Sequence, residues 1–310
     1  MLLTSYLLAG LAIALAWPVP VWLSKAEFVA RAPIATLILW QAIALAGGLS
    51  MIGAFALWGL APLGDSLVAS LVEFWRVVSG RTSADGLGAL HLFALSTAAL
   101  LGVHLVFTLL LTWIRVHRHR IRHRRLLSLL SNPSPTIPRT VVVQHDTPVA
   151  YCVPGVTSAV TVVSRGLMDA LDDDGLAAVL AHERAHLEQR HDLLLLAFES
   201  WHQALPWLPT SRLARSAVHE LIEMLADDAA LQQVPRQTLL RAVVTAATGE
   251  SPVAGAEAAL PEGGLSTHRL KRLITAPVPL PRAAVAGLAS ASALLVLVPT
   301  GLVLVQAVLD

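Results

Sequence analysis

The sequence predicts an α-helical integral membrane protein with four transmembrane helices and a cytosolic α+β domain, mostly helical with a small sheet. The first observation is composition: 55% of the residues are hydrophobic, 14% are charged, and the mean hydropathy is +0.65. A soluble domain is rarely so apolar. The second is a set of four uncharged runs, each longer than the ~20 residues that cross a bilayer. The third is the stretch 115–282, which mixes short β-branched runs with amphipathic segments.

The apolar runs divide the chain into three parts. Residues 1–114 hold spans one to three and an outer loop at 61–89, residues 115–282 form the cytosolic domain, and residues 283–310 hold the fourth span. We expect the first run to remain as a span, because a cleaved signal peptide has a basic leading region and the first charge here is Lys25. Apolar residues at helical spacing predict a surface helix in the outer loop. The predicted spans are Leu2–Leu23, Ala35–Leu60, Leu90–Ile114 and Ala283–Leu309.

The distribution of Lys and Arg predicts the orientation in a bacterial cytoplasmic (inner) membrane. Twelve of these residues flank one face of the predicted spans, whereas Arg76 and Arg81 alone flank the other. Positive residues favour the cytoplasm, so both termini are expected outside and 115–282 inside. Six arginines between 115 and 125 follow span three directly, which favours contact with anionic lipid over direct nucleic-acid binding. A lone Cys152 excludes an internal disulfide and suits a reducing compartment.

Within the cytosolic part, the elements follow from local patterns. A stiff linker at Asn132–Pro138 precedes three β-branched runs that predict a small sheet. Helices are expected at 165–171, from about 173 to about 200, at Ser211–Gln233, at 236–248 and at 268–275, with a mobile loop at 250–265. The whole part is one domain of about 150 residues. The expected strands are Thr140–Gln144, Val149–Val153 and Ala159–Val163.

The second of these helices carries the sequence His182-Glu183-Arg184-Ala185-His186. Two histidines four residues apart lie on one face of a helix and can point at one metal ion. Catalytic zinc takes three protein ligands and keeps one position open, and a distant carboxylate is a common third ligand. Glu223, 37 residues beyond His186, is the predicted third ligand. Asp173 or Asp174 can cap the helix.

These residues predict a zincin, a zinc metalloendopeptidase, with Zn²⁺ held by His182, His186 and Glu223. Zinc makes a water acidic at neutral pH, and Glu183 is the predicted general base that takes its proton and passes it to the leaving amine. Asp227, one turn after Glu223, can hold the far nitrogen of a ligating histidine. The competing interpretation for Glu223 and Asp227 is an exposed acidic face, since Glu220 and Asp228 are acidic as well.

Two other candidates for the third ligand fit less well. His191 lies five residues after His186, and on a straight helix that spacing turns it away by about 140°. Asp192 could serve if the helix ended early, but the compact pattern has glycine at a position that Gln189 occupies here.

Three further residues have more than one interpretation. His268 can polarise the oxyanion of the reaction, although a capped surface histidine is the common alternative. His104 lies in the middle of span three, where its role is either packing or signalling. Cys152 is most simply a small strand residue.

Several segments together resemble the BlaR/MecR family of membrane metallopeptidases: Tyr151–Gly155, Val179–His186, Arg190–Asp192 and Glu223–Asp228. The resemblance implies a gluzincin protease domain between the third and fourth spans, with zinc ligands at His182, His186 and Glu223 and a general base at Glu183. It also implies a cytosolic protein substrate, a DNA-binding repressor of the BlaI/MecI kind, and self-cleavage, for which 250–265 is the candidate segment. It says nothing of the oligomeric state.

One departure concerns the sensor of that family. Members that sense β-lactams carry an external penicillin-binding domain with a Ser-x-x-Lys nucleophile, which we expect this chain to lack. Its lysines, Lys25 and Lys271, are preceded three residues earlier by Trp22 and His268. Covalent capture of a β-lactam is therefore excluded.

Two alternatives remain. The chain is also similar to HtpX-type and CAAX-prenyl proteases, which use the same motif with a later E-x-x-x-D, and the segment Ser266–His268 supports that similarity. It implies protein quality control or processing. A non-catalytic transducer with structural zinc is the other alternative. An intact Glu183 argues against it, since a structural site does not use a general base.

Overall fold

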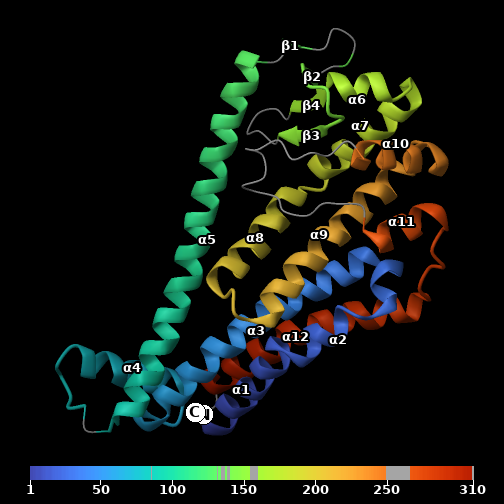
Figure 1. The fold of residues 1–310 in the computed structure, drawn as a ribbon. Coiled ribbons are helices and arrows are strands. Elements are labelled where there is room, and N and C mark those ends of the chain that lie inside the picture. Colours follow the sequence, from blue (N-terminus) through green and yellow to red (C-terminus); the bar gives the residue numbers. More distant parts are fainter. Residues whose placement is uncertain are drawn as a thin grey trace.

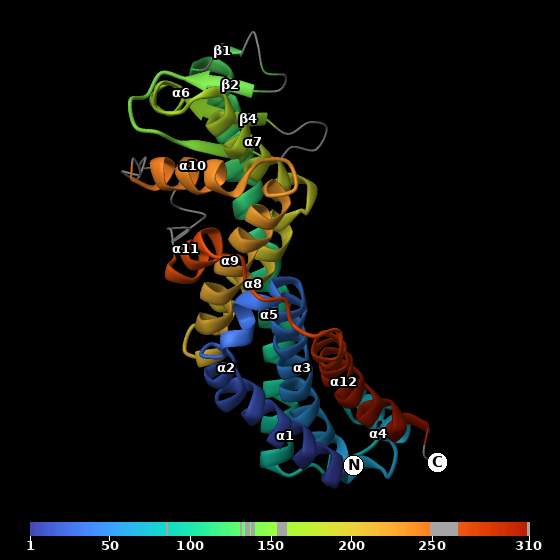
Figure 2. The same ribbon diagram turned by 90° about the vertical axis from the view of Figure 1, so that its right-hand side faces the viewer.

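The computed structural model describes residues 1–84, 86–130, 132–133, 137, 140–153, 160–248 and 266–308. The molecule is elongated, with a bundle of apolar helices at one end and a small sheet at the other (Figures 1 and 2). Met1 and the last described turn of the final helix both lie at the end far from the sheet (Figure 2). The predicted topology requires this arrangement; the side of a membrane that each end faces stays a prediction.

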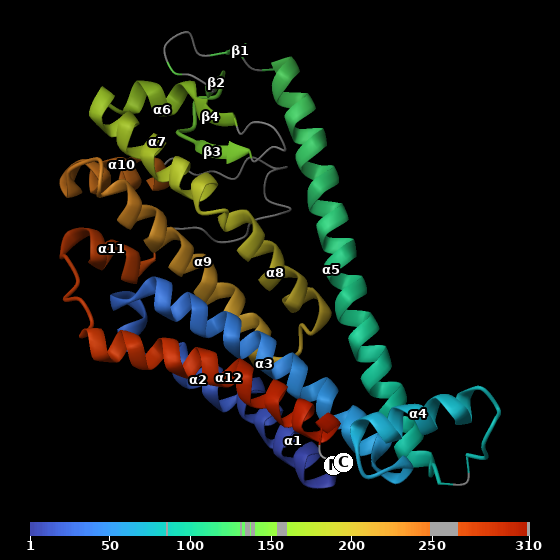
Figure 3. The same ribbon diagram turned by 180° about the vertical axis from the view of Figure 1, so that it is seen from behind.

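Helix α3 is the centre of the apolar bundle. It packs against α1, α5 and α12, and Figure 3 shows α1 and α12 along its length. Because it is surrounded, large side chains such as Trp40 and Ile43 are almost fully buried, whereas Leu100 and Val103 on α5 are exposed. Four helical segments are long and apolar enough to cross a membrane, at the predicted places: Leu2–Leu23, Pro33–Leu63, Ala89–Leu127 and Arg282–Ala307. The helices concerned are α1 (Leu2–Ala16), α2 (Pro18–Leu23), α3 (Pro33–Leu60), α5 (Ala89–Leu130) and α12 (Arg282–Val308).

The helix predicted in the outer loop is confirmed as α4, Leu67–Val78, and its place on a membrane surface stays a prediction. The Ser66 hydroxyl begins it by accepting a hydrogen bond from the Ala69 N–H, which satisfies one of the free amides of a first turn. Val68, Trp75 and other apolar residues of α4 are exposed. The helix lies at the same end of the bundle as Met1 (Figure 1). Two short 3₁₀ helices, η1 (Glu27–Arg31) and η2 (Ala61–Leu63), lie in the connecting loops.

The third apolar run continues as helix far beyond its predicted end. The span was expected to stop at Ile114, but α5 runs to Leu130 and includes the whole basic stretch. Arginine is a good helix former, so a change from apolar to basic residues does not by itself end a helix. Arg120 forms an ion pair with Asp192 at 2.9 Å, which joins α5 to the helix that follows the metal-binding motif. Lipid contact by the other arginines stays a prediction.

The small sheet is confirmed, with the strand order β1-β2-β4-β3. Strands β2 and β4 are parallel, and β3 runs antiparallel to β4 at the edge. Most of the predicted linker at 132–138 lies outside the described residues. The strands are β1 (Asn132–Pro133), β2 (Thr140–Val143), β3 (Ala150–Val153) and β4 (Val160–Ser164).

The helices of the C-terminal half are close to those predicted, with one error. The single helix expected from about 173 to about 200 is two helices, because the chain breaks at Gln189 and Arg190. Arg190 has a left-handed backbone conformation, with φ 51°, which residues other than glycine adopt uncommonly. The helices are α6 (Arg165–Ala170), α7 (Asp173–Glu188), α8 (His191–Ala204), α9 (Pro209–Ala230), α10 (Arg236–Thr248) and α11 (Thr267–Ile274).

The hairpin of α8 and α9 enters the apolar bundle. Its turn residues Leu205 and Leu208 are buried against Met51 of α3 and Leu101 of α5. On α8, the Trp201 ring lies over Gly48 of α3 so closely that a Cβ added to Gly48 would be 3.2 Å from the ring. Residues 115–282 therefore contact the apolar helices through this hairpin, and the predicted division of the chain into domains stays a prediction. Helix α8 has 14 residues and the 22 residues of α9 include several charges, so a search for apolar runs of ~20 residues does not detect the hairpin.

A single hydroxyl ties this hairpin to the first apolar helix. Thr210 Oγ1 lies 2.6 Å from the carbonyl oxygens of both Leu15 and Ala16. The Ala16 carbonyl lacks its helical donor because Pro20 has no N–H. We expect Thr210→Val to destabilise the protein by about 1–3 kcal/mol, the cost of a buried unsatisfied group, and Thr210→Ser to do so far less. Thermal unfolding of the full chain in detergent micelles measures this; equal melting temperatures for the two variants would contradict it.

Candidate metal centre

Two helices bring the predicted site residues together. Helix α7 carries His182, Glu183 and His186, and α9 carries Glu223 and Asp227. Small residues, including Ala181, Ala185, Ala226 and Ala230, are buried on the two helices and allow close approach. The cap of α7 is Asp172 rather than Asp173 or Asp174: its Oδ1 accepts from the Gly175 N–H at 2.8 Å.

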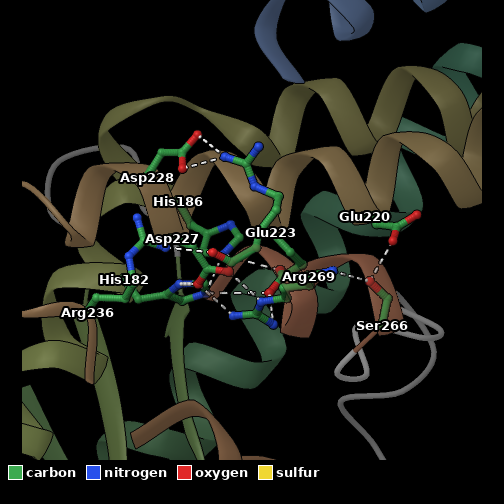
Figure 4. A network of polar contacts seen from close by, with 10 residues as sticks. His182, His186, Glu220, Glu223, Asp227, Asp228, Arg236, Ser266 and Arg269 are labelled. Carbon is green, nitrogen blue, oxygen red and sulfur yellow. Dashed lines mark hydrogen bonds and ion pairs between the residues drawn. The ribbon is translucent and has the colours of Figure 1, made fainter. Parts of the chain in front are cut away.

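The predicted zinc ligands converge on one point (Figure 4). The Nε2 atoms of His182 and His186 are 3.1 Å apart. Glu223 places Oε2 at 3.4 Å from His182 Nε2 and Oε1 at 3.3 Å from His186 Nε2. Tetrahedral zinc with ligands at about 2.0–2.1 Å separates them by about 3.3–3.4 Å. The donor types and their spacings therefore fit zinc, and the three form the group among the described residues that can hold a metal ion.

Asp227 lies where the (i, i+4) spacing placed it, behind His182. Its Oδ1 is 3.0 Å from His182 Nδ1, the nitrogen that faces away from the ligand group. The Nδ1 atom is buried without a well-aligned hydrogen bond, so the contact is chiefly ionic. It leaves Nε2 of His182 free to face a metal.

Arg269 on α11 lies against the carboxylates of Asp227 and Glu223, a contact that was not predicted. Its guanidinium binds Asp227 through two hydrogen bonds, of 2.7 and 2.9 Å, and Nη1 lies 2.8 Å from Glu223 Oε2. The side chain is 7% exposed. Arg269 is one of the twelve basic residues that flank the predicted cytoplasmic face, and nothing in its local pattern separates it from Lys271 or Arg272.

The charges of this group shift its pKa values so that His182 and Glu223 both favour their charged forms. Burial opposes charge on His182, but its contacts with the carboxylates of Asp227 and Glu223 outweigh burial and raise the pKa of His182 to about 10. Burial would raise the pKa of Glu223, but His182 and Arg269 hold it at about 2. The site is therefore built to hold a positive charge between two carboxylates.

Glu183 has the environment of a general base. Burial raises its pKa to about 7, and the charge of Glu223 adds to this, while His182, Arg269 and a hydrogen bond from the Cys152 backbone oppose it. A group with a pKa near 7 can both accept and release a proton at neutral pH. The Cys152 contact places Glu183 beside the edge strand β3. Burial and the charge of Glu183 raise the pKa of the Cys152 thiol to about 12, so it stays protonated.

His191 lies closer to the site than predicted. The argument from a straight helix turned it away, but the break at Arg190 brings its Nδ1 to 3.0 Å from His186 Nδ1. The contact is on the far side of His186, so His191 is still not one of the converging ligands. Its Nε2 lies 3.0 Å from Gln189 Oε1. Asp192 is likewise not a ligand, since it pairs with Arg120.

The remaining candidates lie elsewhere. His268 is exposed, and its Nδ1 is 3.2 Å from Glu220 Oε1, so its predicted oxyanion role rests on no contact with the three ligands. Asp228 pairs with Arg272, which also donates to the Ala30 carbonyl of η1. His104 Nε2 lies 3.0 Å from the Ala204 carbonyl at the end of α8, which favours packing. The predicted self-cleavage segment 250–265 lies outside the described residues.

The raised pKa of His182 predicts how zinc affinity changes with pH. Between about pH 5 and 9 His182 is protonated, whereas His186, with a pKa lowered to about 4 chiefly by burial, is neutral. Zinc must displace one proton, so the dissociation constant of zinc should fall about tenfold for each unit by which the pH rises in this range. Chelator competition on the Glu183→Gln variant, which removes the other group titrating there, measures the slope. A dissociation constant independent of pH would contradict it.

Comparison with known proteins agrees with this geometry. The sequence model of "Peptidase family M48" matches residues 117–273, just over half of the chain. A segment of 55 residues is 40% identical to "Protease HtpX homolog" of Salinibacter ruber (strain DSM 13855 / M31). That segment is 17% of this chain and 20% of the relative, so the chain spans about a fifth of the length of this relative. No solved structure matches the chain.

Proposed function

Because the chain belongs to peptidase family M48, a family of zinc metallopeptidases, we propose that it is a membrane zinc metalloendopeptidase. The observation that carries the proposal is the convergence of His182, His186 and Glu223 at the spacings of tetrahedral zinc ligands. Within this proposal the enzyme is either BlaR/MecR-like, as the sequence resemblance implies, or HtpX-like. The matched relative supports the HtpX-like enzyme at least as well.

The roles of the side chains follow from their positions. Zinc, when bound, supplies a Lewis acid that polarises a peptide carbonyl and makes water acidic. Glu183 takes a proton from the attacking water and delivers it to the leaving amine. Asp227 orients His182, and Arg269 holds Asp227 and Glu223 in place.

The site lies close to the apolar bundle, which bears on the substrate. Leu221 and Ile222, directly before Glu223, are fully buried in one cluster with Leu37 and Trp40 of α3. Arg272 joins α11 to the loop before α3 through the Ala30 carbonyl. If α3 crosses the bilayer as proposed, the zinc site is within a few turns of its surface. We therefore propose that the substrates are polypeptide segments near the cytoplasmic face, with both chain termini outside.

Two substrate classes are compatible with that position. An HtpX-like enzyme would cleave membrane proteins in quality control or processing, and the identity to a protease HtpX homologue favours it. A BlaR-like enzyme would cleave a cytosolic repressor in signalling; α12 after the site and three apolar segments before it favour that arrangement.

A comparison of cells carrying the wild type or Glu183→Ala separates these classes. Intact membrane proteins that accumulate with the variant support the quality-control class, and a cytosolic repressor fragment formed with the wild type alone supports the signalling class. If neither fraction changes while signalling persists with Glu183→Ala, the protein is a transducer with structural zinc and the peptidase proposal fails.

A further inference from the structure

We propose that His191, directed by Gln189, fixes His186 in the one tautomer that can bind zinc. The proposal rests on the proposed zinc site and assigns a positioning role to a residue outside the ligand set. It starts from an asymmetry: His182 has Asp227 behind it, whereas no carboxylate among the described residues contacts the far nitrogen of His186. The ring of His191 occupies that position.

The backbone break at Gln189 and Arg190 creates this contact. A continuous helix would carry His191 around to another face. Because Arg190 is left-handed instead, α8 starts in a new direction and its first residue returns towards α7. His191 is 2% exposed, and its ring meets that of His186 edge-on, with ring centroids 4.9 Å apart and planes at 82°. In this arrangement the Nδ1 atoms of the two rings lie 3.0 Å apart.

The hydrogen-bond directions follow from the donors available. The amide oxygen of Gln189 can only accept, so Nε2 of His191, 3.0 Å away, carries the proton. A neutral imidazole has one N–H, so Nδ1 of His191 is an acceptor. Nδ1 of His186, 3.0 Å from it, must then be the donor. This leaves Nε2 of His186 with its lone pair free, on the side that faces His182 and Glu223.

Turning the Gln189 amide over would reverse every step. Its NH₂ group would donate to His191 Nε2, His191 would donate from Nδ1, and His186 would carry its proton on Nε2, where it blocks the metal. The contact of Gln189 Oε1 with His191 Nε2 therefore favours the tautomer of His186 that can bind zinc.

The test measures zinc affinity and the tautomer of His186 separately from activity. The full chain in detergent, as wild type, His191→Phe and His191→Asn, is titrated with zinc against a competing chelator. Phenylalanine fills the same space without an acceptor, and we expect zinc to bind about 10–100-fold more weakly, as when other outer partners of ligating histidines are lost. Asparagine restores an acceptor, and we expect it to recover much of the affinity. His202→Phe on the same helix, where His202 contacts Ser211, should bind zinc like the wild type.

The second measurement is the nitrogen NMR spectrum of histidine-labelled, chelator-treated protein. In the wild type we expect His186 with its proton on Nδ1, and in His191→Phe a mixture of tautomers. Gln189→Met should shift the mixture less, because Gln189 is exposed and water can replace its oxygen.

The outcomes separate this proposal from the wider one. If His191→Phe binds zinc as tightly as the wild type, or if His202→Phe weakens binding equally, the positioning role is overturned while the zinc site stands. If the wild type itself holds no stoichiometric zinc, the proposed function fails first.

Discussion

Glu183→Gln should lower peptidase activity by about 10²–10⁴-fold, the range for loss of a general base, while the protein keeps its zinc. Glutamine has nearly the same shape but cannot accept a proton. Glu183 is next to His182 in sequence and is not one of the converging ligands, so metal content should not change. Hydrolysis of an unfolded protein substrate by the detergent-purified chain, with zinc measured by atomic absorption, gives both quantities.

Glu188→Gln is the matched control on the same helix. Glu188 is exposed at the end of α7, so the same chemical change there should leave activity within about twofold, as surface changes usually do. Equal losses in the two variants would place the effect in the helix rather than in proton transfer. Full activity of Glu183→Gln would remove the base from the proposed mechanism.

The parts of the site that could be predicted are those set by local spacing. His182, His186 and the pair Glu223 and Asp227 recur at four-residue intervals, and a helix places such residues on one face regardless of its surroundings. The same reasoning located the strands and most helices. Long apolar runs were equally plain, because composition alone identifies them.

The parts that could not be predicted depend on contacts between distant segments. The break at Arg190 has no glycine or proline to announce it, and without it His191 was assigned to the wrong face. Arg269 is one of three basic residues in a short helix, and its burial against Asp227 exists only after α11 folds onto α9. The entry of the α8–α9 turn among the apolar helices likewise depends on Gly48 and the carbonyls near Ala16.

Arg269→Met should destabilise the protein by about 3–5 kcal/mol, because it leaves buried carboxylates without their cation. Asp227 is 4% exposed and would lose two hydrogen bonds, and Glu223 would lose a contact of 2.8 Å. Methionine has a similar length and stays apolar, so the effect is mainly electrostatic. Thermal unfolding in detergent should show a drop on the order of 10 °C.

Two conditions distinguish this explanation from simple loss of packing. Zinc supplies positive charge to Glu223, so the deficit of Arg269→Met should be smaller in zinc-loaded protein than after chelation. Acid should reduce it too: the lowered pKa values of Glu223 and Asp227 contribute stability above about pH 4.5 that is lost as pH falls towards 2. A variant without Arg269 has less of this stability to lose, so the two proteins should converge in acid.

Arg241→Met, at an exposed position on α10, should show no deficit. A deficit unaffected by zinc and pH would mean that Arg269 acts by filling space rather than by balancing the charge of the two carboxylates.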